Sequence, residues 1–161
     1  MDLTVVVASR PNVPPEEDLR VAEVADRLGY PELWVGDGFV WDAFALAAAI
    51  GTATARIPLT VGPIPVTVRD PATIARSAAS VAKVAGRPVG VALGTSSIRV
   101  VERMHGRSRA RAVTALAESA QAVRRLFAGE QADFAGEVLA SHGYRLRLDP
   151  PGGTITLAAF G

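Results

Sequence analysis

The sequence predicts an α/β fold built on parallel strands. Short apolar runs rich in valine alternate along the chain with helical segments, most of which have a capping residue or a glycine at one end. The chain has 161 residues, 49% of them hydrophobic, which is enough for one domain with a substantial core. Strict alternation of strands and helices implies parallel strands joined by right-handed crossovers.

Five strands are predicted from continuous apolar runs, the pattern of strands that are buried on both faces of a sheet. They lie at residues 3–8, 33–35, 57–62, 89–93 and 154–159. The segment between Gly129 and Thr154 is irregular, and its scattered apolar residues indicate a hairpin or an extended excursion before the last strand.

Four helices are predicted, at residues 14–28, 43–54, 71–85 and about 108–128. Asp42 and Asp70 stand where a carboxylate can accept hydrogen bonds from the first N–H groups of a helix. Gly29 and Gly86 stand where a helix ends in a left-handed residue. These local signals set the boundaries of the first three helices.

Two architectures fit this alternation of strands and helices. An open doubly wound sheet suits the length, because a complete eightfold βα barrel needs about 250 residues. A segment of such a barrel is the alternative. The strand order distinguishes them, because a barrel segment keeps its strands in sequential order and a doubly wound sheet reverses direction at a switch point.

Composition excludes several classes of function. With 17 Lys and Arg against 16 Asp and Glu, the net charge of +1 gives no broad field for nucleic acid. There is no cysteine and there are two histidines, so no metal site is predicted. The most apolar stretch, residues 43–55, is too short to span a bilayer, and the N-terminus resembles a strand more than a signal peptide. We therefore expect a cytoplasmic protein without a membrane partner.

Small and polar residues follow three of the predicted strands. Asp37 follows the second strand, Gly62 ends the third, and Gly94 and Ser96 follow the fourth. Because the carboxyl ends of parallel strands share one edge, we expect these residues to meet in one groove. Each also has a simpler explanation: Asp37 as a turn residue bonded to nearby N–H groups, and the other two loops as ordinary connections.

Four stretches in this order resemble the luciferase-like monooxygenase superfamily, in particular its branch that uses the deazaflavin coenzyme F420. They cover nearly the whole chain. They are residues 22–30 with 33–39, 53–62 with 69–75, 91–97 with 101–102 and 105–107, and 126–130 with 134–136 and 155–161.

The resemblance implies a TIM-type (β/α)8 barrel, here an incomplete barrel with about five parallel strands, in which residues 1–161 form a single domain. It implies hydride transfer between coenzyme F420 and a small organic substrate, with FMN and a luciferase-like monooxygenase reaction as the alternative. It also implies a bulge after the third strand, where we expect a cis peptide between Val61 and Gly62. The cofactor-binding residues implied are Asp37, Val61, Gly62, Gly94, Thr95, Ser96 and Ser97.

No catalytic residue is assigned, because the sequence departs from the family at two positions. Gly38 follows Asp37 where the family commonly has a histidine, and Ser97 stands near the place of a glutamate that acts as acid or base. Trp41 can stack on a ring or cover a helix end. His105 and His142 are expected on loops or at the surface. Three arginines at the start of the fourth helix either meet an acidic cofactor tail or form a solvated face; they are Arg107, Arg109 and Arg111.

Five strands are fewer than the eight of a closed barrel, and the phosphate site of such barrels usually follows strands seven and eight. Three interpretations stay open: a fragment of a longer enzyme, a partial barrel completed by a partner, and a non-catalytic binding or assembly subunit. We expect the chain alone to bind cofactor weakly or not at all, and to associate as a homo-oligomer or with a chain that completes the barrel. The partly covered interior face is expected to carry Val5, Val35, Leu59, Val91 and Leu157.

Overall fold

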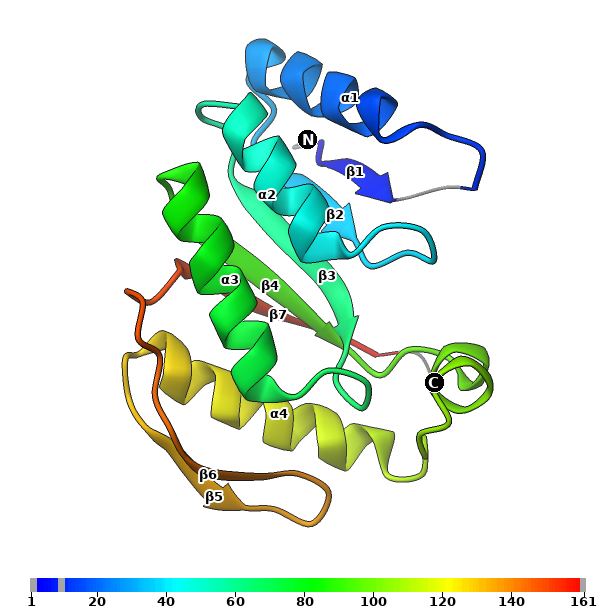
Figure 1. Ribbon diagram of the computed structural model, residues 1–161, viewed down its shortest axis with the longest axis vertical. Coiled ribbons are helices and arrows are strands. Elements are labelled where there is room, and N and C mark those ends of the chain that lie inside the picture. The colour runs from blue at the N-terminus through cyan, green and yellow to red at the C-terminus, as the bar shows by residue number, and fades with distance from the viewer. Residues whose placement is uncertain (1–2, 9–10, 160–161) are drawn as a thin grey trace.

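The fold is a five-stranded parallel sheet with helices on one side (Figure 1), seen in a computed structural model that describes residues 3–8 and 11–159. The strands follow the order β1 (Val5–Ala8), β2 (Leu33–Gly36), β3 (Leu59–Pro65), β4 (Val89–Gly94) and β7 (Gly152–Ala158). All four neighbouring pairs are parallel. The sequential order confirms the barrel segment and excludes the doubly wound sheet.

Four α-helices connect the strands, and their ends lie close to the predicted ones. They are α1 (Pro15–Leu28), α2 (Ala43–Ala53), α3 (Pro71–Ala85) and α4 (Ala112–Phe127). The Asp42 carboxylate accepts hydrogen bonds from the first N–H groups of α2, and Asp70 does the same for α3. Gly29 and Gly86 end α1 and α3 in the left-handed conformation. These caps were predictable because each depends only on neighbouring residues.

The start of α4 differs from the prediction. Residues Arg99–Met104 form a separate π-helix, η1, and Arg111 takes a left-handed conformation with φ of 64° directly before α4 begins at Ala112. The first turns expected from residue 108 onward are therefore a loop. Loop and η1 together lie at the carboxyl end of the sheet (Figure 1).

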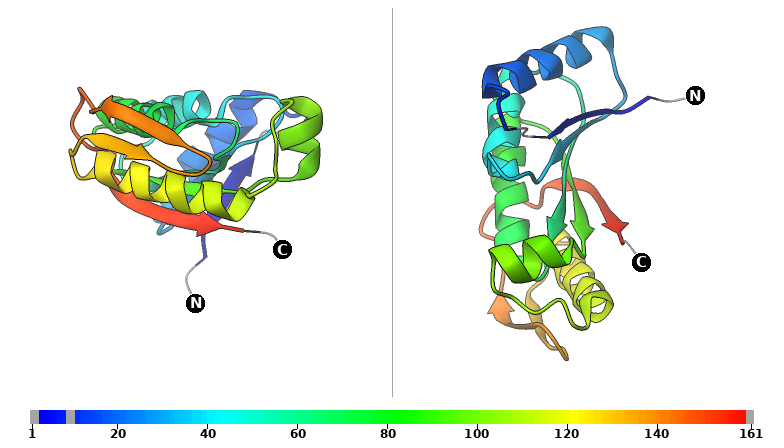
Figure 2. Two further views of the ribbon diagram at one scale, coloured as in Figure 1. Left: turned by 90° about the horizontal axis from the view of Figure 1, so that it is seen from below. Right: turned by 90° about the vertical axis from the view of Figure 1, so that its right-hand side faces the viewer.

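The helices cover one face of the sheet, and the core lies between them and the strands (Figure 2). Val35, Leu59 and Val91 are at most 2% exposed and belong to this core, while Val5 packs against it partly buried. The prediction that these residues line an uncovered interior face is wrong. Leu157, 48% exposed, pairs with the buried Leu93 and so lies on the same helix-covered side.

The opposite face carries Trp34, Thr60 and Gly90, which pair across β2, β3 and β4. Among the described residues no helix packs on this side (Figure 2). The Trp34 indole N–H and the Thr60 hydroxyl each donate a hydrogen bond of 2.6 Å to the Glu32 carboxylate. The continuous apolar runs hid this alternation, because Val, Leu and Ala occupy both phases of several strands.

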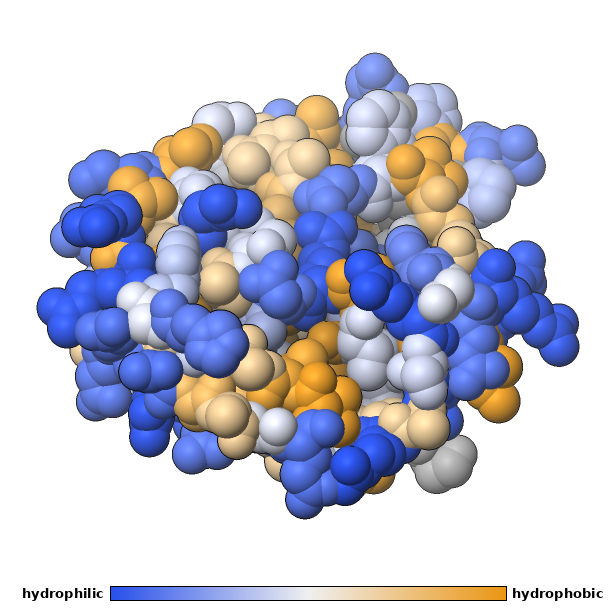
Figure 3. Space-filling view, turned by 60° about the horizontal axis from the view of Figure 1, so that its bottom comes forward, coloured by the Kyte–Doolittle hydropathy of each residue, from blue (hydrophilic) through white to orange (hydrophobic). Residues whose placement is uncertain are grey.

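A hairpin of β5 (Ala132–Ala135) and β6 (Ala140–Tyr144) interrupts the alternation after α4, as predicted. Its turn rests on α4, where the Glu118 carboxylate accepts hydrogen bonds from three consecutive backbone N–H groups; they belong to Glu137, Val138 and Leu139. On the side of the molecule seen in Figure 3, hydrophobic residues lie in small groups between hydrophilic ones.

In the part of the chain that the structure describes, β1 and β7 pair with a neighbour strand on one side only. The sheet is thus an open segment of a barrel. None of the described helices is long and apolar enough to cross a membrane.

Candidate functional site

A cavity of about 320 Å³ lies at the carboxyl ends of the strands, between the segments that follow β2, β3 and β4. We call it the rim cavity. Its polar lining residues are Asp37, Asp42, Arg69, Ser96 and His105. Its apolar lining includes Phe39, Val40, Trp41, Pro63, Pro65, Val68, Val100 and Met104. In a βα barrel this end of the strands carries the active site.

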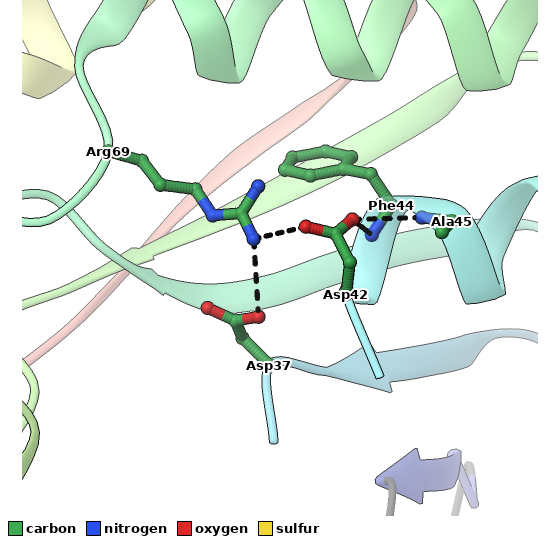
Figure 4. A network of polar contacts seen from close by, with 5 residues as sticks. All are labelled: Asp37, Asp42, Phe44, Ala45 and Arg69. Atoms are coloured by element: carbon green, nitrogen blue, oxygen red, sulfur yellow. Dashed lines mark hydrogen bonds and ion pairs between the residues drawn. The ribbon is translucent and has the colours of Figure 1, made fainter. Parts of the chain in front are cut away.

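Three charged side chains meet at one wall of the rim cavity (Figure 4). Asp37 follows β2, Asp42 caps α2, and Arg69 directly precedes the cap of α3. One Arg69 nitrogen, Nη2, hydrogen-bonds Asp42 Oδ2 and lies 3.8 Å from Asp37 Oδ1. The Asp37 side chain is 13% exposed and that of Asp42 44% exposed, so the arginine joins a largely buried and a half-exposed carboxylate.

The two carboxylates differ in acidity although they share one arginine. Burial raises the pKa of Asp37, and the positive charge of Arg69 only partly offsets this. Burial also acts on Asp42, but hydrogen bonds from Arg69 and from the N–H groups of Ala45 and Phe44 bring its pKa below the ordinary value. Asp37 is therefore the group in this cluster that is closer to taking up a proton.

The third strand has the predicted bulge beside the cavity. The pairing of β3 with β4 shifts register between Val61 and Ile64. Gly62 has φ of 134°, and a Cβ there would collide with the Ala92 carbonyl oxygen. The cis peptide bond joins Gly62 to Pro63, so the expected cis bond between Val61 and Gly62 is wrong by one residue. A bond to proline has the smallest preference for trans.

The predicted cofactor residues in the segment after β4 have different positions and contacts. Ser96 lines the rim cavity with φ of 54°, and its carbonyl accepts a 2.9 Å hydrogen bond from Arg109 Nε. Ser97 Oγ accepts a hydrogen bond from the Val100 N–H at the start of η1. Thr95 is 2% exposed, and its hydroxyl finds no hydrogen-bond partner among the described residues.

The seven predicted cofactor residues thus share one end of the sheet but not one surface. Asp37 and Ser96 line the rim cavity. Gly94 lies behind it, where an added Cβ would be 2.9 Å from the Pro63 Cβ atom. Val61 is fully buried in the core. Pro63, which lines the cavity, takes the place expected for its neighbour Gly62.

Sequence reasoning missed the roles of Arg69 and Asp42 in the cavity. The prediction that His105 lies on a loop or at the surface is confirmed, because His105 is exposed in the turn after η1; it also lines the rim cavity, as does Trp41. One signal was available: Arg69 immediately precedes the Asp70 cap, which fixes its backbone at the carboxyl end of β3.

The other histidine and the arginines are accounted for elsewhere. His142 is exposed on the hairpin. Arg109 bonds the Ser96 carbonyl, Arg111 forms an ion pair with Glu137, and Arg107 is exposed. Arg109 and Arg111 therefore make contacts within the protein. The described residues contain no group of three His, Asp or Glu side chains placed to hold a metal ion.

Comparison with known proteins supports this view of the fold. The family model described as luciferase-like monooxygenase matches residues 2–161. No curated protein sequence matches the chain. Solved structures do: a monooxygenase from Streptomyces bottropensis has a TM-score of 0.81 at 23% identity, over 96% of this chain and 53% of that one.

Two further structures show the same fold. The coenzyme F420-dependent tetrahydromethanopterin reductase of Methanopyrus kandleri has a TM-score of 0.86 at 14% identity, over 99% of this chain and 50% of that one. The oxygenating constituent of 3,6-diketocamphane monooxygenase from Pseudomonas putida, in complex with FMN, has a TM-score of 0.79 at 16% identity, over 100% and 52%. The chain spans about half the length of the structures it matches.

Proposed function

The chain belongs to the luciferase-like monooxygenase family, and on that premise we propose that it forms part of an oxidoreductase that transfers a hydride between coenzyme F420 and a small organic substrate. The observation that carries the proposal is the rim cavity, which lies at the carboxyl ends of three adjacent strands and joins a charged wall to an apolar one. FMN and a monooxygenase reaction are the alternative.

The residues at the rim cavity fit a flat ring system. At about 320 Å³ the cavity is at the small end of ligand pockets, so it suits the ring of such a cofactor and not its whole length. Pro63 at the bulge and Ser96 after β4 would flank the ring, with Asp37 at its polar edge. The buried, unpartnered Thr95 hydroxyl lies one residue from Ser96 and has hydrogen-bonding capacity to spare.

When bound, the deazaflavin or flavin ring supplies the hydride chemistry. The chain's own residues orient the ring and adjust the charge beside it. Trp41 and Met104 present apolar surface at the mouth of the cavity, 41% and 51% exposed respectively, which suits an uncharged organic substrate.

F420 is proposed ahead of FMN because the four stretches of the sequence described above resemble the F420-dependent branch of the family. A binding measurement distinguishes the two cofactors.

We also propose that the open edges β1 and β7 are covered in the working protein, by a second copy or by a chain that completes the barrel. Unpaired strand edges and exposed apolar surface favour association. A groove beside β1 has such a surface, with Val21 40% exposed and Leu28 66% exposed. Sedimentation velocity tests this: association supports it, and a stable monomer at high concentration contradicts it. A non-catalytic binding or assembly subunit is the second candidate, and it would share the fold without binding a cofactor.

A fluorescence titration of the purified chain with F420, and separately with FMN, tests the cofactor assignment. We expect weak saturable binding, with a Kd on the order of 100 μM, because only part of the barrel rim is present. The Asp37→Ala variant should weaken it about tenfold, and Asp149→Ala, a change at an exposed carboxylate remote from the cavity, should not. Tighter binding of FMN would favour the monooxygenase alternative. The rim cavity narrows the expectation of weak or no binding to weak binding, so absence of binding to both would contradict the cofactor site in this chain.

A further inference from the structure

Arg69 occupies an unusual position between two carboxylates that come from the same loop. Its Nη2 atom faces both Asp37 and Asp42, and its guanidinium carbon lies 5.6 Å from the centre of the Phe44 ring (Figure 4). The single positive charge of Arg69 therefore faces two carboxylates, and the cluster carries a net negative charge when both carboxylates are ionised.

Asp42 anchors the arginine, whereas Asp37 does not. Asp42 accepts hydrogen bonds of 3.0 Å from the N–H groups of Phe44 and Ala45 as well as one from Arg69. This fixes Asp42 to the first turn of α2, and the Phe44 ring holds the guanidinium from one side. Arg69 reaches Asp37 only as an ion pair at 3.8 Å, which is beyond hydrogen-bond distance.

We propose that Arg69 is the positioning residue of the rim cavity: held by Asp42 and Phe44, it keeps the Asp37 carboxylate ionised at the cavity wall, ready to accept a hydrogen bond. The bound group would be an uncharged donor, such as a hydroxyl or a ring N–H. This inference rests on the proposed function for its role in turnover, but not for the charge of Asp37, which is a property of the cofactor-free chain.

The groups around Asp37 define what controls its charge. Arg69 faces it from the segment after β3, Asp42 from the first turn of α2, and His105 from the end of η1. Burial disfavours the ionised form and Asp42 adds to that effect, whereas Arg69, the backbone N–H of Ala43 and His105 oppose it. Arg69 is the largest of the opposing influences, so it is the group that most favours the ionised, hydrogen-bond-accepting form of Asp37.

An ionised Asp37 also makes the cavity selective. It repels an anionic group and leaves a neighbouring O–H or N–H donor as the favoured contact. The phosphate of a nucleotide-like cofactor would therefore lie away from this wall, with the ring edge or the substrate hydroxyl toward it.

The test is a pH titration of the Asp37 side-chain carboxyl by carbon NMR in the cofactor-free chain. Arg69→Gln should raise the pKa of Asp37 by about one unit, a tenfold change in its protonation equilibrium, and Arg69→Lys should restore part of it. Asp42→Asn should move the pKa of Asp37 in the opposite direction, because it removes a negative charge beside Asp37 while the asparagine side-chain oxygen can still accept a hydrogen bond from Arg69. Asparagine retains the ability to cap α2, so this variant keeps the fold.

Arg99→Gln is the matched control. Arg99 precedes the cavity-lining Val100 in the chain, and its guanidinium lies over the ring of Phe39, 5.7 Å from the centroid. Its removal should leave the titration of Asp37 unchanged. The proposal is overturned if Arg69→Gln leaves the titration unchanged, if Asp42→Asn shifts it the same way as Arg69→Gln, or if Arg99→Gln shifts it equally. A failure to bind F420 or FMN would overturn the proposed function and leave these results intact.

Discussion

The two ends of the sheet differ in how fully their polar side chains are hydrogen-bonded. At the amino ends of the strands, the Arg87 guanidinium donates five hydrogen bonds of 2.6 to 3.3 Å to carbonyls and to the Thr54 hydroxyl. At the carboxyl ends, Arg69 shares one nitrogen between two carboxylates, and the hydroxyls of Thr67 and Thr95 lack partners among the described residues.

This difference distinguishes polar groups that stabilise the fold from polar groups that can bind a ligand. Asp26, like Arg87, is fully used at the amino end: its carboxylate accepts hydrogen bonds from three successive N–H groups, those of Ala55, Arg56 and Ile57. Buried polar groups that are satisfied stabilise the fold, whereas those left unsatisfied have capacity for a ligand. The rim cavity lies at the end where that capacity remains.

The largest expected effect is loss of the amino-end arginine. Arg87→Ala leaves several carbonyl groups without a donor, so we expect the free energy of unfolding to fall by about 3 kcal/mol. Arg69→Ala at the other end should cost less than about 1 kcal/mol, because Asp42 keeps its bonds to α2. Urea unfolding of both variants measures the difference. An equal loss of unfolding free energy in the two variants would contradict the claim that the amino end is the more important one for stability.

The same substitution at two threonines sharpens the comparison. Thr54 is 7% exposed, and its hydroxyl donates to the Ile50 carbonyl and accepts from Arg87, both at 2.6 Å. Thr54→Val should therefore destabilise the protein by about 2 kcal/mol. Thr95→Val removes an unpartnered hydroxyl and should change stability by less than about 0.5 kcal/mol. Thermal unfolding decides: a larger loss at Thr95 would show that its hydroxyl already has a structural partner.

A smaller effect is the opposite pH dependence of the stability that an aspartate contributes at each end of the sheet. Burial raises the pKa of Asp26, but its three N–H donors bring it below the ordinary value, so Asp26 stabilises the fold above that value and ceases to do so as the pH falls through the lowered pKa. Burial raises the pKa of Asp37, so its contribution is present at low pH and is lost as the pH rises through the raised pKa.

Asp26→Asn should thus lose roughly 1 kcal/mol at neutral pH and less in acid. Asp37→Asn should gain stability relative to the wild type as the pH rises. Urea unfolding of both variants across this pH range measures the two trends. Trends of the same sign would contradict the contrast.

The sequence was informative where structure depends on neighbouring residues. The caps at Asp42 and Asp70 and the glycine at the end of α1 follow from local backbone chemistry, and the sequential strand order followed from the family resemblance. The start of α4 was missed because apolar spacing does not reveal the left-handed Arg111 or the π-helix before it.

Features that join distant segments were not predictable in the same way. Arg69 and Asp42 are 27 residues apart, and nothing in either segment indicates that their side chains meet. The faces of the strands were also misassigned, because Val35 and Val91 lie in runs that are apolar at every position. The cis peptide was placed one residue early, at Val61, because the bulge was predicted but its exact geometry was not.

Backbone amide NMR with and without coenzyme F420 tests most directly whether the carboxyl end is the binding end. Every amide reports separately, so both ends of the sheet are compared in one experiment. We predict that the largest shifts fall at residues 37–42 and 94–98, and that residues 54–57 beside Asp26 and Arg87 do not change. Shifts centred on the amino ends, or spread evenly over the sheet, would contradict the assignment of the rim cavity as the cofactor site.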